Sequence, residues 1–295
     1  MLNKYRNKLI VDGKSSLTVS AYCNDISQFL NWLENTIGYT TEVITETDLR
    51  EYRQYLNLQK KLKVTSINRK IKSIVQFQRF LYRKGIGKEE VELRKVLLKN
   101  NIEIDYEVKV VEKQELYRIK RSIEALGNKR DILIYFLLFG TGVRCNELVS
   151  LELGDIHLTE RNGKNNYSYV VIRSGKGGKV RKINLNPQVV NAVKEYLVVR
   201  PNVSSNLLLQ GQRGSLTRLA INKILEKYSR KAQLDCVITP HMARHTFCTN
   251  LIKEGKVDPK TVAILSGHSS VDTLYRFYVN SSAEDKQKAV DCLQV

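Results

Sequence analysis

The chain has 295 residues, of which 42% are hydrophobic and 27% charged, a balance typical of a folded protein. Its formal net charge of +19 favours a polyanionic partner, with nucleic acid the first interpretation and an anionic membrane surface the second. No apolar run approaches the roughly 20 residues of a membrane-spanning helix, and the N-terminal residues lack the apolar core of a signal peptide. We therefore expect a cytoplasmic protein without a membrane partner.

The first hundred residues read as helical, because their apolar residues recur three and four positions apart. The pattern predicts helices over about 15–38, 47–58 and 65–85, with serine or threonine at each start and glycine closing the first and third. Basic residues interleave on the third helix and are candidates for contacts to DNA, although a solvated surface explains each of them equally well: Arg69, Lys70, Lys72 and Arg79.

Residues 100–108 lack helical periodicity and read as a linker between a domain of residues 1–99 and a second domain of residues 109–295. Two segments rich in β-branched and aromatic residues flank SGKGG and predict a β-hairpin with strands at 167–173 and 179–185. The predicted fold is therefore mostly α, with a small antiparallel β-sheet in the second domain. Helices are predicted over 111–126, 131–139 with a stop at Gly140, from Thr141 onward, and over 187–199, 216–232, 240–253, 258–266, 270–278 and 282–293.

Six groups in the second domain suit attack on a phosphodiester. Arginine can meet the charge that develops on the non-bridging oxygens, because its rigid fork binds phosphate bidentately and stays protonated. Thr239-Pro240 predicts the start of a helix with two basic residues on one face of its first turn, where anions are favoured. The six groups are Arg144, Lys176, His241, Arg244, His268 and Tyr278.

The attacking group of such a site would be a tyrosine, whose hydroxyl has a pKa of about 10 in water and needs a base or a cationic setting. His241 or His268 can take its proton, and Lys176, on the predicted hairpin turn, can protonate the leaving oxygen. Lys179, on the same turn, is an alternative acid.

The sequence predicts neither a metal nor a cofactor. The five cysteines are isolated, and no cluster of carboxylates suggests Mg²⁺. His245 lies four residues after His241, but Met242 stands where an H-E-x-x-H zinc motif needs glutamate. We therefore expect His245 to be a buried, hydrogen-bonding residue that supports the site, and His157 to lie on the surface.

The six groups stand in the order of a known pattern: Arg, Lys, His-x-x-Arg, His or Trp, and Tyr. Their surroundings read TGVRCNEL (141–148), SGKGGKVRKINL (174–185), TPHMARHTFCTNLI (239–252) and LSGHSSVDTLYRFY (265–278). Over nearly its whole length the chain resembles the tyrosine recombinases of the phage-integrase and Xer type. The resemblance implies a two-domain, C-shaped clamp on duplex DNA, with a helical, SAM-like core-binding domain and a tyrosine-recombinase catalytic domain.

The resemblance also implies a reaction. Tyr278 would form a 3′-phosphotyrosyl link and release a 5′-hydroxyl, with Arg144 as a phosphate clamp that Glu147 supports. Two rounds of exchange would pass through a Holliday junction without metal or ATP. A homo-tetramer on inverted-repeat core sites would carry out the recombination. In this tetramer the helix at 282–293 would dock on a neighbouring subunit.

The spacing of the tyrosine departs from that of many members of the family. Theirs lies nine residues after the His or Trp position, which here is Phe277. Tyr278 lies ten residues after His268, a spacing that the family also contains, and Tyr275 is the second candidate for the nucleophile.

Further candidates for DNA contacts come from the hairpin and from the basic amphipathic helix at 216–232, where the family places a DNA-contacting helix. A solvated surface is again the alternative for each. These candidates are Lys179, Arg181, Arg218 and Lys223.

The helical domain begins almost at Met1, which favours a simple resolvase or Xer-like recombinase over an integrase that needs a separate arm-binding domain. An integrase of a phage or transposon remains the alternative within the class. A type IB topoisomerase and a non-catalytic DNA-binding module are the alternatives outside it. We expect the protein at the nucleoid, where accessory DNA-bending proteins are possible partners.

Overall fold

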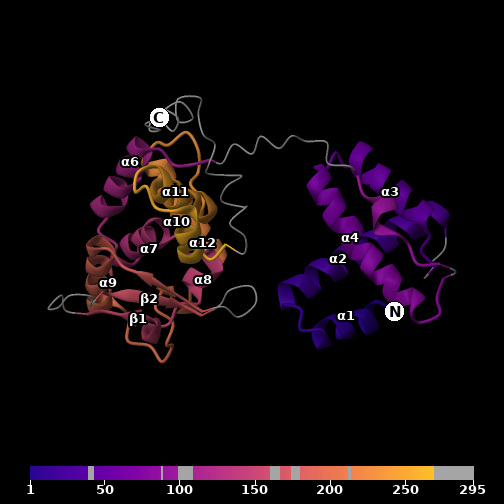
Figure 1. Ribbon diagram of the computed structural model, residues 1–295, viewed down its shortest axis with the longest axis horizontal. Coiled ribbons are helices and arrows are strands. Elements are labelled where there is room, and N and C mark those ends of the chain that lie inside the picture. Colours follow the sequence, from indigo (N-terminus) through magenta and orange to yellow (C-terminus); the bar gives the residue numbers. More distant parts are fainter. Residues whose placement is uncertain are drawn as a thin grey trace, which may run out of the picture. The chain divides into compact units, whose positions relative to one another are not determined.

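The computed structural model describes residues 1–38, 43–87, 89–98, 109–159, 167–173, 180–211 and 214–268. The chain divides into two compact units, Met1–Asp105 and Tyr106–Val295, each with its own hydrophobic core (Figure 1). Both units are mostly helical, and the second also contains small antiparallel sheets. Within the described ranges, no helix has the length and apolar character that crossing a membrane requires.

The three N-terminal helices predicted from periodicity are present in the first unit. Ser15 caps the first of them by accepting a hydrogen bond from the backbone of Thr18, and Gly38, at a φ of 79°, ends it. Thr45 and Asp48 form a capping box at the start of the next. The helices of this unit are α1 (Leu2–Val11), α2 (Ser16–Ile37), α3 (Glu46–Leu58), α4 (Val64–Tyr82) and α5 (Leu93–Val96).

Helix α1 was not predicted from the sequence, and neither was the single turn α5. Only Tyr5 and Leu9 of α1 are buried, so its apolar face is too narrow to stand out as a repeat. The ring of Tyr5 lies 5.2 Å, centroid to centroid, from each of Phe77 and Phe80 on α4. Packing against α4 therefore stabilises α1, and such packing is not encoded in a local pattern.

Aromatic rings of α2 and α3 form the centre of this unit. Phe29 is fully buried, and its ring centroid lies 5.1 Å from that of Tyr52 and 6.1 Å from that of Trp32. Trp32 also lies 5.8 Å from Tyr55, again between ring centroids. Large buried rings of this kind contribute most of the hydrophobic stabilisation of a small helical unit.

Phe29→Ala should lower the free energy of unfolding of the first unit by about 3–5 kcal/mol, because it leaves a cavity at the centre of the core. Trp32 is the single tryptophan of the chain, so its fluorescence follows this unit in the full-length protein during chemical denaturation. Leu58→Ala, at a residue 61% exposed, is the control and should change the value by less than about 0.5 kcal/mol. Equal losses in the two variants would contradict the central place of Phe29.

The second unit begins with α6 and holds its longest buried stretch in α7. In Figure 1, α6, α7 and α9 lie on one side of this unit, with α10, α11 and α12 on the other. Its helices are α6 (Lys113–Ala125), α7 (Lys129–Thr141), α8 (Cys145–Val149), the 3₁₀ turn η1 (Leu153–Asp155), α9 (Pro187–Val199), α10 (Arg218–Lys231), α11 (Pro240–Lys253) and α12 (Pro259–Ser266).

Two small antiparallel sheets accompany these helices. The predicted hairpin is present, with Val170 of one strand paired with Ile183 of the other, and both side chains are buried. Its strands are shorter than predicted, and a third, short strand adds to its edge, so the order is β1-β2-β3. The strands are β1 (Ile156–His157), β2 (Tyr169–Ile172), β3 (Arg181–Asn184), β4 (Gln210–Gly211) and β5 (Gly214–Ser215).

The prediction that α7 stops at Gly140 was wrong. The helix continues to Thr141, and Gly142, at a φ of 61°, ends it. Gly140 instead allows a close approach of two helices, because a Cβ there would lie 2.7 Å from a methyl group of Val189 on α9. The helix expected from Thr141 onward begins later, at Cys145. The predicted linker at 100–108 and the predicted helices at 270–278 and 282–293 fall outside the described residues.

Candidate active site

Arg144 immediately precedes α8 as its N-cap residue. Its backbone nitrogen donates to Glu147 Oε2 at 2.7 Å, which closes the first turn of α8. Its guanidinium donates through Nη1 to Glu147 Oε1 at 3.0 Å and through Nη2 to the carbonyl oxygen of Gly267 at 2.6 Å. The side chain remains 42% exposed, so the guanidinium is oriented by the protein and is still open to an anion.

Arg244 lies in the first turns of α11, which starts where Thr239-Pro240 predicts it. Thr239 caps this helix by accepting a hydrogen bond from the backbone of Met242. The Arg244 side chain is buried and donates through Nη1 to the carbonyl oxygen of Gly142 at 2.8 Å. Burial, and then the charge of nearby Arg144, lowers the pKa of Arg244 to about 10, so it remains a cation at neutral pH.

The Glu147 carboxylate is the anion between these cations. It is buried and accepts from Arg144 and from both terminal nitrogens of Arg181, at 3.0 and 2.7 Å. Burial alone would raise the pKa of Glu147, but its hydrogen bonds from Arg181 and Arg144 hold that pKa below the usual range. The carboxylate is therefore ionised at neutral pH and offsets part of the repulsion among the arginines.

Arg181, a candidate DNA contact from the sequence, is hydrogen-bonded within the protein. Its side chain is only 10% exposed, and its guanidinium is used by Glu147 and by the carbonyl oxygen of Leu265. The basic side chain on a short strand reads as a surface residue in sequence, because the carboxylate that buries it lies 34 positions away.

His268 follows α12, and its hydrogen bonds define its tautomer. Ser266 Oγ lies 2.6 Å from the carbonyl oxygen of Val262, to which it donates, and 2.6 Å from His268 Nδ1. Because the hydroxyl has one proton, we infer that Nδ1 carries a proton and donates it to Oγ, which leaves Nε2 as an acceptor. Arg244 Nη2 lies 3.4 Å from Nε2 and 3.5 Å from Nδ1, beside the edge that the two nitrogens share. Burial, and then the charges of Arg244 and Arg144, lowers the pKa of His268 to about 3.

His241 and His245 lie one turn apart on α11, with their ring centroids 4.1 Å apart. His241 is exposed, whereas His245 is half-buried, less deeply than the sequence predicts. Burial, and then Arg244, lowers the pKa of His241. Burial, and then His241, lowers the pKa of His245 to about 4. The histidine rings of this site are therefore neutral at pH 7, and each neutral ring can accept a proton.

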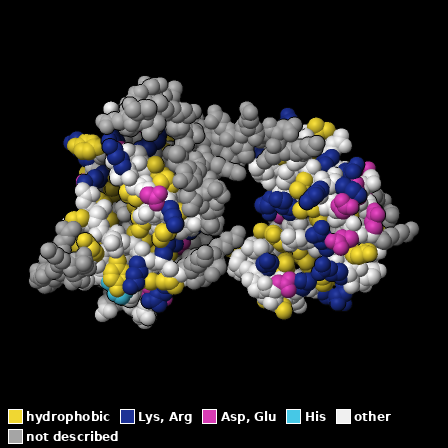
Figure 2. All heavy atoms as spheres, viewed as in Figure 1, with side chains coloured by type: hydrophobic (Ala, Val, Ile, Leu, Met, Phe, Trp, Pro, Cys, Tyr) yellow, Lys and Arg dark blue, Asp and Glu magenta, His cyan; other side chains and the backbone are white. Residues whose placement is uncertain are grey.

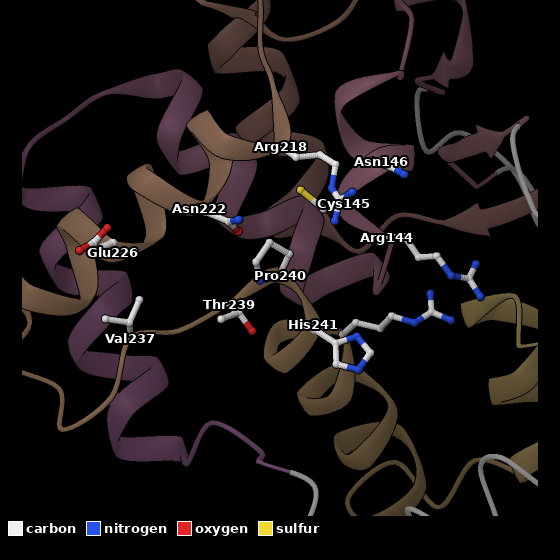
Figure 3. A pocket seen from close by; sticks show the side chains of 11 residues that line it. Arg144, Cys145, Asn146, Arg218, Asn222, Glu226, Val237, Thr239, Pro240 and His241 are labelled. Atoms are coloured by element: carbon white, nitrogen blue, oxygen red, sulfur yellow. The ribbon is translucent and has the colours of Figure 1, made fainter. Parts of the chain in front are cut away.

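Arg144, His241 and Arg244 line an open cavity of 560 Å³ that α8, α10 and α11 border (Figure 3). Arg218, at the start of α10, points toward Cys145, whose pKa is raised by burial in spite of a hydrogen bond with Arg218. Sequence reasoning did not single out four other members of this wall, since nothing in their local pattern marks them. They are Cys145, Asn146, Asn222 and Glu226.

Two glycines that sequence reasoning did not assign to the site supply the carbonyl oxygens for its arginines. Gly142 ends α7 and accepts from Arg244, and Gly267 ends α12 and accepts from Arg144. Both have positive φ, 61° and 70°, which glycine adopts without strain. A Cβ on Gly142 would also lie 2.3 Å from the ring of Phe247. A glycine next to each motif, in TGVR and SGH, is the signal that could have found them.

Several predicted site residues lie outside the described part of the chain, so the structure does not place them. They are Lys176, Lys179, Tyr275 and Tyr278. His157 is half-buried, with its ring stacked 4.5 Å from that of Tyr169, centroid to centroid, and takes no part in the cavity.

The remaining DNA-contact candidates differ in whether they form ion pairs within the protein and in how exposed their side chains are. Arg69 and Lys70 on α4 both pair with the buried carboxylate of Asp25, and the Arg69 side chain remains 51% exposed. Arg79 pairs with Glu90 at 2.7 Å. Figure 2 shows Lys and Arg on the visible face of each unit, interspersed with acidic groups. Lys72, Arg218 and Lys223 are exposed as well.

Gly142→Ala should lower the free energy of unfolding of the second unit by about 3 kcal/mol, because the new methyl group meets Phe247 and the backbone is strained. Chemical denaturation followed by circular dichroism measures the change. Gly154→Ala is the matched control, since it has ordinary φ and open space around its Cβ, and should be close to neutral. A neutral Gly142→Ala would contradict the close packing of α11 against this turn.

Acid should destabilise the second unit through its histidines. The pKa values of about 4 for His245 and about 3 for His268 lie below the value of about 6.5 in an unfolded chain. The unfolded chain therefore binds more protons below pH about 6.5, and this contribution to stability, complete above that pH, is lost as the pH falls toward about 4. His268→Gln should flatten the decline, measured by urea unfolding at several pH values. An unchanged slope would contradict a neutral, half-buried His268.

The chain matches two family models. One is the Phage integrase family, over residues 109–285, and the other is Phage integrase, N-terminal SAM-like domain, over residues 2–85. The TnP I resolvase of Bacillus thuringiensis is 34% identical over 275 residues, 92% of either chain. Tyrosine recombinase XerA of Pyrococcus furiosus is 28% identical over 296 residues, which cover 99% of this chain and 93% of that one.

Solved structures share the fold. XerH site-specific recombinase bound to difH substrate superposes with a TM-score of 0.70 at 23% identity, over 99% of this chain and 84% of that one. The Tn1549 transposon integrase in complex with a circular intermediate DNA gives a TM-score of 0.72 at 19% identity, over 99% of both chains.

Proposed function

Because the chain belongs to the phage integrase family of tyrosine recombinases, we propose that it recombines duplex DNA at specific sites through a covalent link to Tyr278. The observation that carries the proposal is the cavity of 560 Å³ in which Arg144 and Arg244 converge with His241. Cations held by neighbouring carbonyl and carboxylate groups suit the charge that develops on a phosphodiester under attack.

In the proposed first step, the hydroxyl oxygen of Tyr278 attacks the phosphorus, and the bond from phosphorus to the 5′ oxygen breaks. Arg144, exposed at the cavity, and Arg244, buried behind it, bind the non-bridging oxygens. Lys176, or Lys179 as the alternative, gives a proton to the 5′ oxygen, which leaves as a hydroxyl. A 5′-hydroxyl of a second strand then attacks the phosphotyrosine, and the tyrosine hydroxyl is restored.

The proton of the tyrosine hydroxyl needs an acceptor, and the site contains neutral histidines that can take it. His268 presents Nε2 beside Arg244, and its low pKa makes it a weak base while the site holds no anion. A phosphate bound to the arginines adds negative charge, which opposes the main charge effects that lower this pKa. DNA therefore raises the basicity of His268, or of His241, when the proton has to move.

The proposed reaction conserves bond energy, because one phosphodiester is exchanged for a phosphotyrosine and back. It therefore needs neither ATP nor a metal ion, since arginines fill the role that Mg²⁺ has in other phosphoryl transfers. Among biological roles, resolution of the Xer or transposon type is favoured by the similarity to TnP I resolvase over 92% of the chain. Integration is the alternative. In either role we propose a tetramer on inverted-repeat sites, with or without accessory DNA-bending proteins.

Tyr278→Phe should abolish the covalent complex with DNA, because phenylalanine lacks the attacking oxygen. A pool of duplexes with randomised inverted half-sites, selected for binding to the full-length protein and then nicked within the spacer, serves as a suicide substrate. The wild type should give a protease-sensitive band that migrates slowly on a denaturing gel. Tyr275→Phe is the control and should keep the band.

Three other outcomes contradict the proposal. A band in Tyr278→Phe that disappears in Tyr275→Phe would move the nucleophile to Tyr275. Relaxation of supercoiled plasmid without a preferred sequence would indicate a topoisomerase. Tight binding to the selected sites without a band in any variant would indicate a DNA-binding module without this chemistry.

A further inference from the structure

Arg181 donates hydrogen bonds to a residue of the active site but does not line the cavity. It is the first residue of β3, and both its terminal nitrogens donate to the two oxygens of Glu147, at 3.0 and 2.7 Å. Its Nε donates to the carbonyl oxygen of Leu265 at 3.0 Å. With 10% of its side chain exposed, its guanidinium has little surface left for a phosphate.

Gly267 is fitted to the guanidinium of Arg181. A Cβ on Gly267 would lie 2.8 Å from Arg181 Nη1 and 2.9 Å from its Cζ, so only glycine leaves room for this contact. The carbonyl oxygen of the same glycine accepts from Arg144. Arg181 and Arg144 thus share both the Glu147 carboxylate and the turn of residues 265–268, which carries His268.

We propose that Arg181 is a positioning residue for strand cleavage: it orients Glu147 and the turn 265–268, and through them Arg144 and His268. The proposal rests on the function proposed above and adds to it a residue outside the six-member set. The sequence analysis gave Arg181 as a candidate for a DNA contact. In this proposal Arg181 orients other side chains and touches no substrate.

The consequence of losing Arg181 follows from the hydrogen bonds. Glu147 is buried and would keep Arg144 as its only charged hydrogen-bond partner in the described structure, so both oxygens would compete for that guanidinium. A bidentate pair with Glu147 would draw Arg144 away from Gly267. The turn would lose its bonds at Leu265 and Gly267, and the bond from His268 Nδ1 to Ser266 Oγ would move with it.

Two neighbours provide matched controls. Lys182 follows Arg181 on β3, is exposed, and tests the loss of one positive charge near DNA. Arg173, just after β2, pairs with the buried Asp155, which makes it the counterpart of Arg181 at the other end of the hairpin turn. Arg173→Gln tests the loss of an exposed arginine that pairs with a buried carboxylate other than Glu147.

The experiment compares Arg181→Gln, Lys182→Gln and Arg173→Gln in the full-length protein, with the selected suicide substrate. Arg181→Gln should lower the single-turnover rate of covalent complex formation roughly ten- to a hundredfold, because small misplacements of catalytic groups have effects of that size. Its equilibrium binding of the same duplex should stay within about threefold of the wild type. Both controls should cleave at near wild-type rates. Arg181→Lys, which keeps the charge without the fork, should lie between.

A second measurement does not depend on cleavage. The chain has four histidines, so the imidazole ¹⁵N spectrum is simple, and His268→Gln identifies the signals of His268. These signals should show the Nδ1–H tautomer in the wild type and in both controls, and should shift in Arg181→Gln and Arg181→Lys. Thermal unfolding verifies that each variant is folded, and Arg181→Lys replaces the glutamine variant if that one is not.

The outcomes separate this proposal from the proposed function. Unmoved His268 signals, or wild-type cleavage by a folded Arg181 variant, would overturn the positioning role. An equal loss of binding and cleavage would restore Arg181 as a DNA contact. If the wild type itself forms no covalent complex, the proposed function fails, and the shift of the His268 signals still decides whether Arg181 holds the turn.

Discussion

The candidate site depends on one buried carboxylate. Arg144 and Arg181 lie close enough to Arg244 to help lower its pKa, and both donate to Glu147, so without an anion among them the three cations would repel one another. Glu147 ties α8 to β3 directly, and its two arginines tie both elements to the end of α12. Segments from three parts of the chain are thereby fixed before any DNA arrives, which is the preorganisation that electrostatic catalysis requires.

The sequence indicated the type of chemistry at this site better than it indicated the contacts that position the site residues. The order of Arg144, His241, Arg244 and His268 pointed to phosphoryl transfer, because few reactions need such a set of cations and imidazoles. It did not reveal the role of Arg181, since a contact across 34 residues depends on how the hairpin packs on α8. Nor did it reveal Ser266, whose hydroxyl bond to Val262 decides which nitrogen of His268 holds the proton.

The fold shows the same division between local and distant causes. Helices with wide apolar faces, such as α2 and α4, were predictable, as was the hairpin of β2 and β3. Helix α1 was missed because its stability comes from Tyr5 packing on α4. Gly140 was predicted to end its helix, but it allows the close contact of α7 with α9. From the sequence alone, a glycine that ends a helix cannot be told from one at a helix crossing.

The two glycines that end α7 and α12 have a wider consequence. Each offers a main-chain oxygen to an arginine, Gly142 to Arg244 and Gly267 to Arg144. A peptide carbonyl persists whatever side chain stands at its position, so no single substitution can delete these acceptors; it can only misdirect them by changing the local path of the chain. The anchoring of both guanidiniums thus depends on backbone conformation. Surrounding side chains can be substituted as long as the two left-handed turns keep their conformation.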